Sequence, residues 1–201
     1  MIEAELLSDR RVGETRDVVT RDAVTRDAVT RDVVTSESEL RAIVGRPLPW
    51  FQSKLLTRLD LKCRQFIARS PFVVVASSRD DGLMDLSPKG DPAGFVQVLD
   101  ERTLALPERA GNRRVDTLYN VLKHSGVGLI FFVPGQGETL RVAGQASIVR
   151  DRALRETMAI KGRPPELALI VAVERAFFHC ARCIGRSKLW DRREAAAPAS
   201  V

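Results

Sequence analysis

One short segment of the sequence combines residue types that bind anions. In AGNRRVD, Gly111 and Asn112 favour a tight turn, and Arg113 and Arg114 follow directly. An apolar-periodic stretch, VDTLYNVL, starts at the same point, so we expect a helix whose first N–H groups are free and whose N-terminal end is positive. Asn112 is a suitable cap for that helix. Two guanidiniums at such an end predict a pocket for phosphate or carboxylate oxygens.

The simpler alternative for these arginines is a solvated helix end in which Asp116 pairs with one of them. A second segment, DLSPKGDPAGF, places Ser87 and Lys89 at the end of an expected strand, where glycines and prolines enforce an unusual backbone path. Alone, this segment is consistent with a loop carrying a surface lysine. Together, the two segments would bring a hydroxyl, an ammonium and two guanidiniums to neighbouring strand ends.

A third segment, HCARC, holds His179, Cys180 and Cys183 at a spacing that has three interpretations. A structural zinc site would need further ligands, for which Cys63 and His124 are the other candidates. A redox-active thiol pair would fit a strand-to-helix junction, which is where the segment falls. We favour the third interpretation, in which small residues pack a terminal helix against the body of the protein, and we predict no metal site.

The elements that would position these residues are mainly short strands. Seven β-branched or alternating runs are separated by turn residues: FVVVASS, LMDLSPK, GFVQVLD, TLALP, GVGLIFFV, TLRVAGQASIV and ELALIVAVERAFF. Helices are expected at SESELRAIV, RLDLKCRQFIARS, residues 115–122, DRALRETMAI and HCARCIGRSKLW. Leu59, Phe66 and Ile67 should face inward, and RDDG should form a hairpin with Gly82 at positive φ. This pattern predicts a small antiparallel barrel with flanking helices, a mainly β (α+β) protein.

The N-terminal region differs in character from the rest of the chain. Residues 16–35 repeat a five-residue unit four times, RDVVT RDAVT RDAVT RDVVT, and a period of five gives no continuous apolar face on a helix or a strand. We expect residues 1–35 to form a flexible tail, with an ordered oligomerisation arm as the alternative. The folded domain should span 36–193, beginning with a helix capped by Ser36 and Glu39, and 194–201 should be disordered.

Charge and composition restrict the class of partner. The net charge is +6, but residues 1–40 hold 6 arginines against 10 acidic residues, so the remainder carries +10. Such a body favours an anionic partner. Aromatic residues make up only 5% and are not interleaved with basic ones, so we do not expect a nucleic-acid partner. No apolar run approaches the ~18 residues of a membrane span, and no secretory signal is evident, so we expect a cytoplasmic protein without a membrane partner.

The order of these motifs, from SPFVVVASS through SPKGD, GNRR and ETLRVAGQA to HC and RSKLW, resembles the pyridoxamine 5'-phosphate oxidase-like family of FMN-binding split barrels, and within it a bacterial branch. The resemblance covers roughly residues 40–190. It implies a six-stranded antiparallel split β-barrel with flanking helices. It also implies a homodimer that holds FMN at the subunit interface.

The same resemblance implies which residues contact the cofactor. Those expected to bind FMN are Met84, Asp85, Leu86, Ser87 and Lys89 along the flavin, Leu106 and Pro107 beside the ring, Asn112, Arg113 and Arg114 at the phosphate, Thr139 on a later strand, and Arg186, Ser187 and Trp190 from the partner subunit. No catalytic residue is nominated, because the cofactor carries the chemistry.

The function implied is an FMN-dependent oxidoreductase, a flavoprotein acting on an unidentified small organic substrate. Met84 stands where the best-known oxidase of the family has an arginine, and the Arg-x-His pair with which that enzyme grips its substrate has no match here. We therefore expect a substrate other than pyridoxamine phosphate. The alternative is a non-catalytic flavin or haem carrier or sensor on the same barrel.

Overall fold

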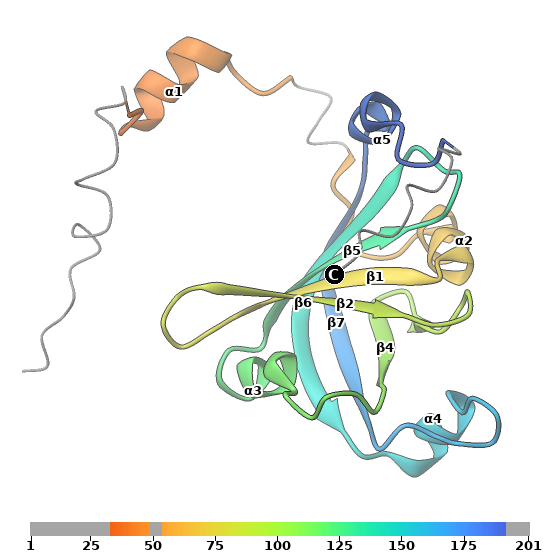
Figure 1. Cartoon of the computed structure of the whole chain (residues 1–201). Coiled ribbons are helices and arrows are strands. Elements are labelled where there is room, and N and C mark those ends of the chain that lie inside the picture. Colours follow the sequence, from red (N-terminus) through yellow and green to blue (C-terminus); the bar gives the residue numbers. More distant parts are fainter. Residues whose placement is uncertain (1–32, 49–53, 192–201) are drawn as a thin grey trace, which may run out of the picture. The chain divides into compact units, whose positions relative to one another are not determined.

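The computed structural model describes residues 33–48 and 54–191, and the chain divides into two units, Met1–Pro47 and Leu48–Val201. The first unit contains helix α1 (Glu37–Val44; Figure 1). The Ser36 hydroxyl accepts a hydrogen bond from the Glu39 amide at 3.1 Å, and Gly45 ends the helix at φ +76°, which confirms the expected cap and stop. The expected tails lie outside the described residues, except for residues 33–35.

The second unit is built on one antiparallel sheet with flanking helices, so the expectation of a mainly β protein is confirmed (Figure 1). The strand order is β2-β1-β5-β6-β7-β4-β3. The seven strands match the seven extended runs of the sequence and exceed by one the six implied by the family resemblance. Their bounds are β1 Phe72–Ser78, β2 Met84–Gly90, β3 Gln97–Asp100, β4 Thr103–Glu108, β5 Gly126–Phe132, β6 Thr139–Val149 and β7 Leu167–His179.

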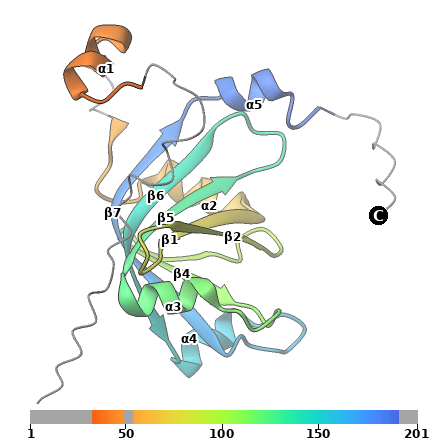
Figure 2. The same ribbon diagram turned by 60° about the vertical axis from the view of Figure 1, so that its left-hand side comes forward.

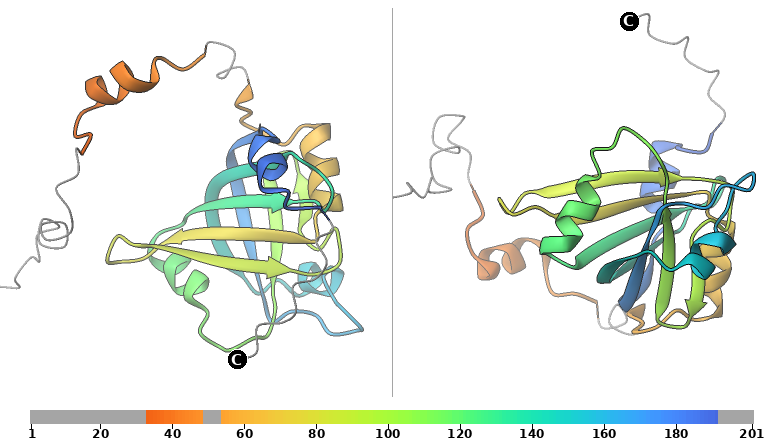
Figure 3. Two further views of the ribbon diagram at one scale, coloured as in Figure 1. Left: turned by 45° about the horizontal axis from the view of Figure 1, so that its top comes forward. Right: turned by 90° about the horizontal axis from the view of Figure 1, so that it is seen from below.

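The sheet curls because of its two longest strands. The register of β6 with β7 shifts between Ala143 and Gly144, which is a β-bulge that bends the pair. Gly144 is required there, since a Cβ atom would collide with the Ala172 carbonyl oxygen. β2 and β3 lie at the two ends of the strand order and do not pair, so the sheet stays open (Figure 3).

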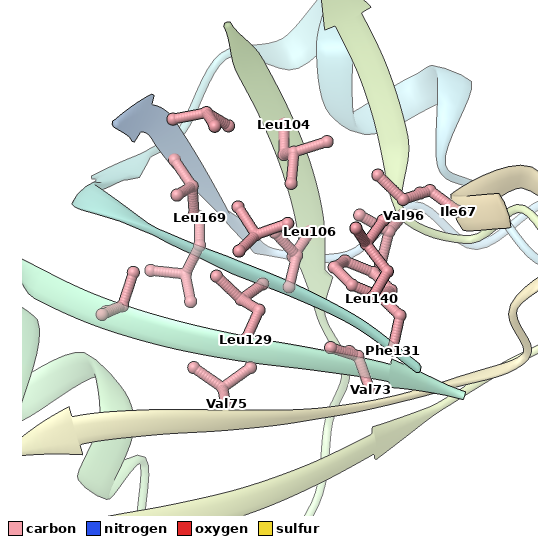
Figure 4. Close-up of a cluster of buried hydrophobic side chains, with 14 of the residues drawn as sticks. Ile67, Val73, Val75, Val96, Leu104, Leu106, Leu129, Phe131, Leu140 and Leu169 are labelled. Carbon is pink, nitrogen blue, oxygen red and sulfur yellow. The ribbon is translucent and has the colours of Figure 1, made fainter. Parts of the chain in front are cut away.

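One continuous core fills the inside of the curl. In β1, Val73 and Val75 point inward while their neighbours face the other side, and Leu129 and Phe131 of β5 do the same. Figure 4 shows these side chains converging with those of β4, β6 and β7. Each buried leucine or valine contributes about 1.5–3 kcal/mol through removal of apolar surface from water. The largest fully buried side chains are Phe131, Leu59, Ile67, Leu104, Leu106, Leu140, Leu169, Val73, Val75 and Val171.

The helices cap the curled sheet. In α2 (Leu61–Arg69), the Asp60 carboxylate accepts from the Cys63 amide at 2.8 Å, and the helix ends at Ser70 because Pro71 follows. Leu59, just before this helix, and Phe66 and Ile67 within it are all buried in the core, as the sequence predicts. The other helices are α3 Asp116–Lys123, α4 Arg152–Thr157 and α5 Arg182–Ser187. Within the described ranges, no helix has the length and apolar character that a bilayer crossing requires.

The β1–β2 hairpin and α3 together shape one end of the unit. Gly82 adopts φ +77°, and the Arg79 amide donates to the Leu83 carbonyl at 2.9 Å, so the predicted hairpin turn is confirmed. α3 packs against β1 and β2, as Figure 2 shows, and buries Leu118 and Val121 against the sheet. The segment that carries the paired arginines, residues 109–115, leads directly into α3.

Candidate functional site

The turn before α3 is held by local side-chain bonds. The Asn112 carbonyl Oδ1 accepts from the Arg114 amide at 3.0 Å, and the Arg114 guanidinium lies 2.8 Å from the Asp116 carboxylate. Arg113 is exposed and makes no ion pair or hydrogen bond with any described residue. One arginine is therefore partly neutralised by the predicted Asp116 pairing, and the other keeps its full charge.

The prediction that Asn112 caps the helix is wrong. The N-cap position is Val115, with φ +49° and no side-chain cap hydrogen bond, and α3 starts at Asp116. Asn112 lies three residues too early, and its carbonyl is already used within the turn. Arg113 also has a positive φ, +63°. Two non-glycine residues in the left-handed region, one of them β-branched, are a local strain of the kind that collects at functional sites.

The predicted site residues of β2 divide between the two faces of the sheet. Ser87 and Lys89 stand opposite Val75 and Val73, whose side chains form the core, and Asp85 stands opposite buried Ser77. Met84 and Leu86 alternate with them and are exposed on the outer face. A single ligand therefore cannot contact all five side chains on one face of this strand.

Two ion pairs join the end of β2 to the end of β4, and we call them the seam. The Lys89 Nζ lies 2.7 Å from the Glu108 carboxylate, with only 13% and 19% of these side chains exposed. The Arg109 Nε lies 2.6 Å from Asp91, and the same guanidinium donates to the Met158 carbonyl at 2.9 Å. Because β2 is one edge of the sheet and β4 is the strand next to the other edge, these side chains link strands that do not pair in the sheet.

Leu106 and Pro107 of β4 lie inside the protein. Leu106 is part of the core between Leu104 and the seam residue Glu108, and Pro107 is buried on the opposite face of the strand, paired in register with Ala168. Neither side chain is open to a ligand on the surface of one subunit.

The outer face of the sheet carries a groove of about 560 Å³ over β1, β5, β6 and β7. The predicted residues Leu86 and Thr139 line it, and so do Arg141 and Arg175, which the sequence analysis missed. The Arg141 guanidinium lies 5.3 Å from the centre of the Phe177 ring, a cation–π contact. The signal available for Arg141 was strand alternation, because it lies between buried Leu140 and Val142, whereas Arg175 follows exposed Glu174 and breaks the alternation of its strand.

A second, apolar groove of about 390 Å³ continues the first, since Val74 and Phe132 line both. Its far wall is Trp190, whose indole N–H donates to the Gln136 carbonyl at 2.7 Å. We call the two grooves together the outer groove. It brings Leu86, Thr139 and Trp190 to one face of the subunit.

The other predicted residues of the C-terminal segment lie on α5. The Ser187 hydroxyl donates to the Ile184 carbonyl at 3.1 Å, so it closes its own helix turn. Arg186 is exposed. The first turn of α5 rests on the β5–β6 loop, where a Cβ at Gly137 would lie 2.7 Å from the Ala181 side chain.

A charged cavity of about 350 Å³ lies between the β1–β2 hairpin and α3. Predicted residue Asp85 lines it beside Asp116 and Asn120, and Asn120 donates to the buried Ser77 hydroxyl at 2.9 Å. At its rim, the Lys123 ammonium 2.9 Å away holds the pKa of Asp80 below its ordinary value. Asp116, which directly follows the strained turn, lines this cavity with the hairpin residues, so Asp85 lies near the start of α3.

These features define a class: an antiparallel, mainly β subunit with flanking helices, a strained turn that carries two arginines, and a grooved outer face. The sequence model of the family described as pyridoxamine 5'-phosphate oxidase matches residues 59–180, which is more than half of the chain. The protein belongs to this family. Comparison with curated protein sequences gave no match.

Solved structures of HupZ from Group A Streptococcus have the same fold. One is 21% identical, with 59% of this chain and 92% of that chain covered and a TM-score of 0.50. A single-residue variant of HupZ gives 22% identity, 60% and 99% coverage and the same TM-score. A protein of Lactobacillus delbrueckii described as a pyridoxamine 5'-phosphate oxidase candidate is 22% identical over 61% of this chain and 95% of that chain, with a TM-score of 0.48.

Proposed function

We propose that this protein is an FMN-dependent oxidoreductase of the pyridoxamine 5'-phosphate oxidase family that acts on an unidentified small organic substrate. The observation that carries the proposal is the turn at Arg113, an exposed guanidinium without a partner among the described residues, held in a strained conformation next to Arg114. An uncompensated cation held in strain is expected where a ligand supplies the missing anion.

The residues present fit the phosphate group of FMN at this turn. Arg113 and Arg114 can each donate two parallel hydrogen bonds to phosphate oxygens, and the adjacent positive end of α3 favours the same charge. Lys89 fits less well, because Glu108 already holds its ammonium at 2.7 Å. We therefore assign the phosphate to the two arginines and give Lys89 a structural part in the seam.

The remaining residues would position the ring and keep water away. When bound, FMN supplies hydride acceptance and donation at its ring nitrogens. Leu86 and Thr139 of the outer groove offer an apolar wall and one hydroxyl, and Arg141 and Arg175 offer positive charge beside them. Cations near a flavin ring stabilise negative charge that develops on it during reduction.

We further propose that two copies of the chain associate through the outer face of the sheet. This face is lined over both grooves by apolar side chains that include Val74, Ile130 and Phe132. A contiguous apolar surface rimmed by arginines is typical of a subunit interface. A partner seated there would place Arg186 of its α5 and Trp190, which follows that helix, close to the cofactor of the first subunit.

The absorption spectrum of the purified protein tests the proposal. The protein should be yellow and release FMN on denaturation, and Arg113→Ala/Arg114→Ala should lose the flavin and stay folded. Arg150→Ala/Arg152→Ala is a matched control, because it removes two exposed arginines near α4 and should keep the colour. Colourless wild-type protein that does not quench the fluorescence of added FMN would refute the proposal.

Reduction of the bound flavin separates the enzyme from the carrier. An oxidoreductase should be bleached anaerobically by a nicotinamide donor or by its substrate and regain its colour in air or with an acceptor. A carrier or sensor would bind flavin or haem and show no turnover. Light scattering on the same samples should give twice the mass of one chain.

A further inference from the structure

The three cysteines lie in two contrasting settings. Cys63 is a fully buried residue of α2, and burial is the main cause that raises the pKa of its thiol to about 12. Cys180 and Cys183 are exposed at the junction of β7 and α5. Only the second pair can meet solutes, and the proposed flavin chemistry does not use it.

The backbone places Cys180 and Cys183 on one turn. The Cys183 Sγ lies 4.0 Å from the Cys180 carbonyl oxygen, and Ala181 between them is helical at φ −68°, ψ −7°. Residues three apart on a helical turn have Cβ atoms about 5–6 Å apart. A disulfide needs about 3.5–4.5 Å, so a shift of roughly 1 Å would close the bond. All of residues 180–183 are exposed, so no packed core opposes such a shift.

We propose that Cys180 and Cys183 are a reversible dithiol–disulfide pair that exchanges with small-molecule disulfides such as glutathione disulfide. The Cys180 thiolate attacks one sulfur of the reagent, whose S–S bond breaks and releases one thiol. The Cys183 thiolate then attacks the Cys180 sulfur and releases the second thiol. The protein loses two protons and two electrons, which reduce the disulfide of the reagent to two thiols.

The surroundings support attack at Cys180. Cys180 lines a cavity of about 480 Å³ with His179, Lys62 and Glu138, whereas Cys183 lines the outer groove. A reagent can therefore reach Cys180 from this cavity, which meets the outer groove at His179. Cys183 is one turn away and can resolve the mixed disulfide.

The pair sits where α5 is fixed to the barrel. Ala181, between the two cysteines, packs against Gly137, and Trp190 beyond the helix bonds to the Gln136 carbonyl. Ile184, buried and next to Cys183, lines the outer groove. A cross-link in this turn would restrict opening of the segment that carries Ile184 and Trp190, so the thiol redox state should set how firmly α5 covers the end of the groove.

Intact mass measurement on the full chain tests the pair. After reduction and treatment with glutathione disulfide, the wild type should lose two hydrogens and regain them with dithiothreitol. Trypsin cleaves after Arg182, between the two cysteines, so the product should contain two peptides joined by the bond. In Cys183→Ser, the reaction should stop at the mixed disulfide between Cys180 and one glutathione. Cys63→Ala is the matched control and should behave as the wild type.

Several results would overturn the proposal: no reaction, stable glutathione adducts on the wild type, a bond between two chains, or a linked peptide that contains Cys63. A second readout tests the link to α5. Hydrogen exchange of the amides of residues 183–190 should slow by severalfold in the oxidised protein and not in oxidised Cys183→Ser. Equal exchange in the oxidised and reduced wild type would refute the effect on α5.

Discussion

The seam and the arginine turn use the same kinds of charged side chain in opposite ways. At the seam, Lys89 and Arg109 are largely buried and each lies within 2.7 Å of a carboxylate. At the turn, only four residues further along the chain, Arg113 is exposed without a partner among the described residues and Arg114 lies against an exposed Asp116. Burial with a partner makes a cation part of the fold, whereas exposure in a strained turn leaves it available to a ligand.

This difference matters because the family resemblance groups Lys89 with Arg113 and Arg114 as cofactor contacts. The seam pairs join strands that share no backbone hydrogen bonds, so they contribute to holding the open sheet curled. The turn cations join nothing beyond their own loop among the described residues. Variants in the two regions should therefore separate stability from ligand binding.

The largest effect is expected at the seam. Glu108→Ala would leave the Lys89 ammonium largely buried without its carboxylate, which should lower the free energy of unfolding by about 3 kcal/mol. Urea denaturation of the apo protein measures the loss. Replacing both partners, Lys89→Met/Glu108→Leu, should restore most of the lost stability, since a buried apolar pair has no charge that needs a partner. If Glu108→Ala were as stable as the wild type, the seam would not contribute to holding the sheet.

The next effect is expected at the turn, on binding alone. Arg113→Ala should weaken FMN binding by about 2 kcal/mol, roughly thirtyfold, because it removes charge-assisted bonds to the phosphate. Its free energy of unfolding should stay within about 0.5 kcal/mol of wild type, as for other exposed positions. Fluorescence titration with FMN and urea denaturation give the two numbers. A loss of stability comparable to that of Glu108→Ala would erase the distinction between the regions.

A smaller effect of opposite sign comes from the backbone at the same residue. Arg113 is held at φ +63°, where glycine is not penalised and other residues lose about 1 kcal/mol. The free energy of unfolding of Arg113→Gly should therefore be about 1 kcal/mol higher than that of Arg113→Ala. Both variants should bind FMN equally weakly. Equal stability of the two variants would mean that the turn relaxes when the guanidinium is removed.

Much of the fold follows from local sequence, whereas ion pairs between strands that are distant in the chain do not. Strand alternation, the Gly82 hairpin, the Ser36 cap and the end of α2 before Pro71 involve neighbours in the chain, and the structure confirms them. The partner of Lys89 is 19 residues away and on a strand that is not adjacent in the sheet, so no local pattern identifies Glu108.

The candidate site shows a second limit, which is local. The sequence indicates an anion-binding turn, but Asn112 was expected to cap α3 because residue preference does not reveal the left-handed backbone at Arg113 and Val115. All five residues of β2 were expected along the flavin, whereas the structure places Met84 and Leu86 on one face of the strand, and Ser87 and Lys89 on the other. Which of these faces would meet a cofactor depends on how the proposed dimer assembles, and the assignment of the fourteen residues to FMN stays a prediction.

The smallest effect distinguishes two roles for Asp116. Its carboxylate is an exposed partner of Arg114 at 2.8 Å, so Asp116→Asn should change the free energy of unfolding by no more than about 0.5 kcal/mol. If Asp116 only competes with the phosphate for Arg114, removing its charge should tighten FMN binding about threefold at low salt, and the gain should disappear at high salt. If binding weakens instead, Asp116 holds Arg114 in position for the phosphate. The turn would then be preorganised by its own ion pair, as the seam is, and the contrast between the two regions would rest on Arg113 alone.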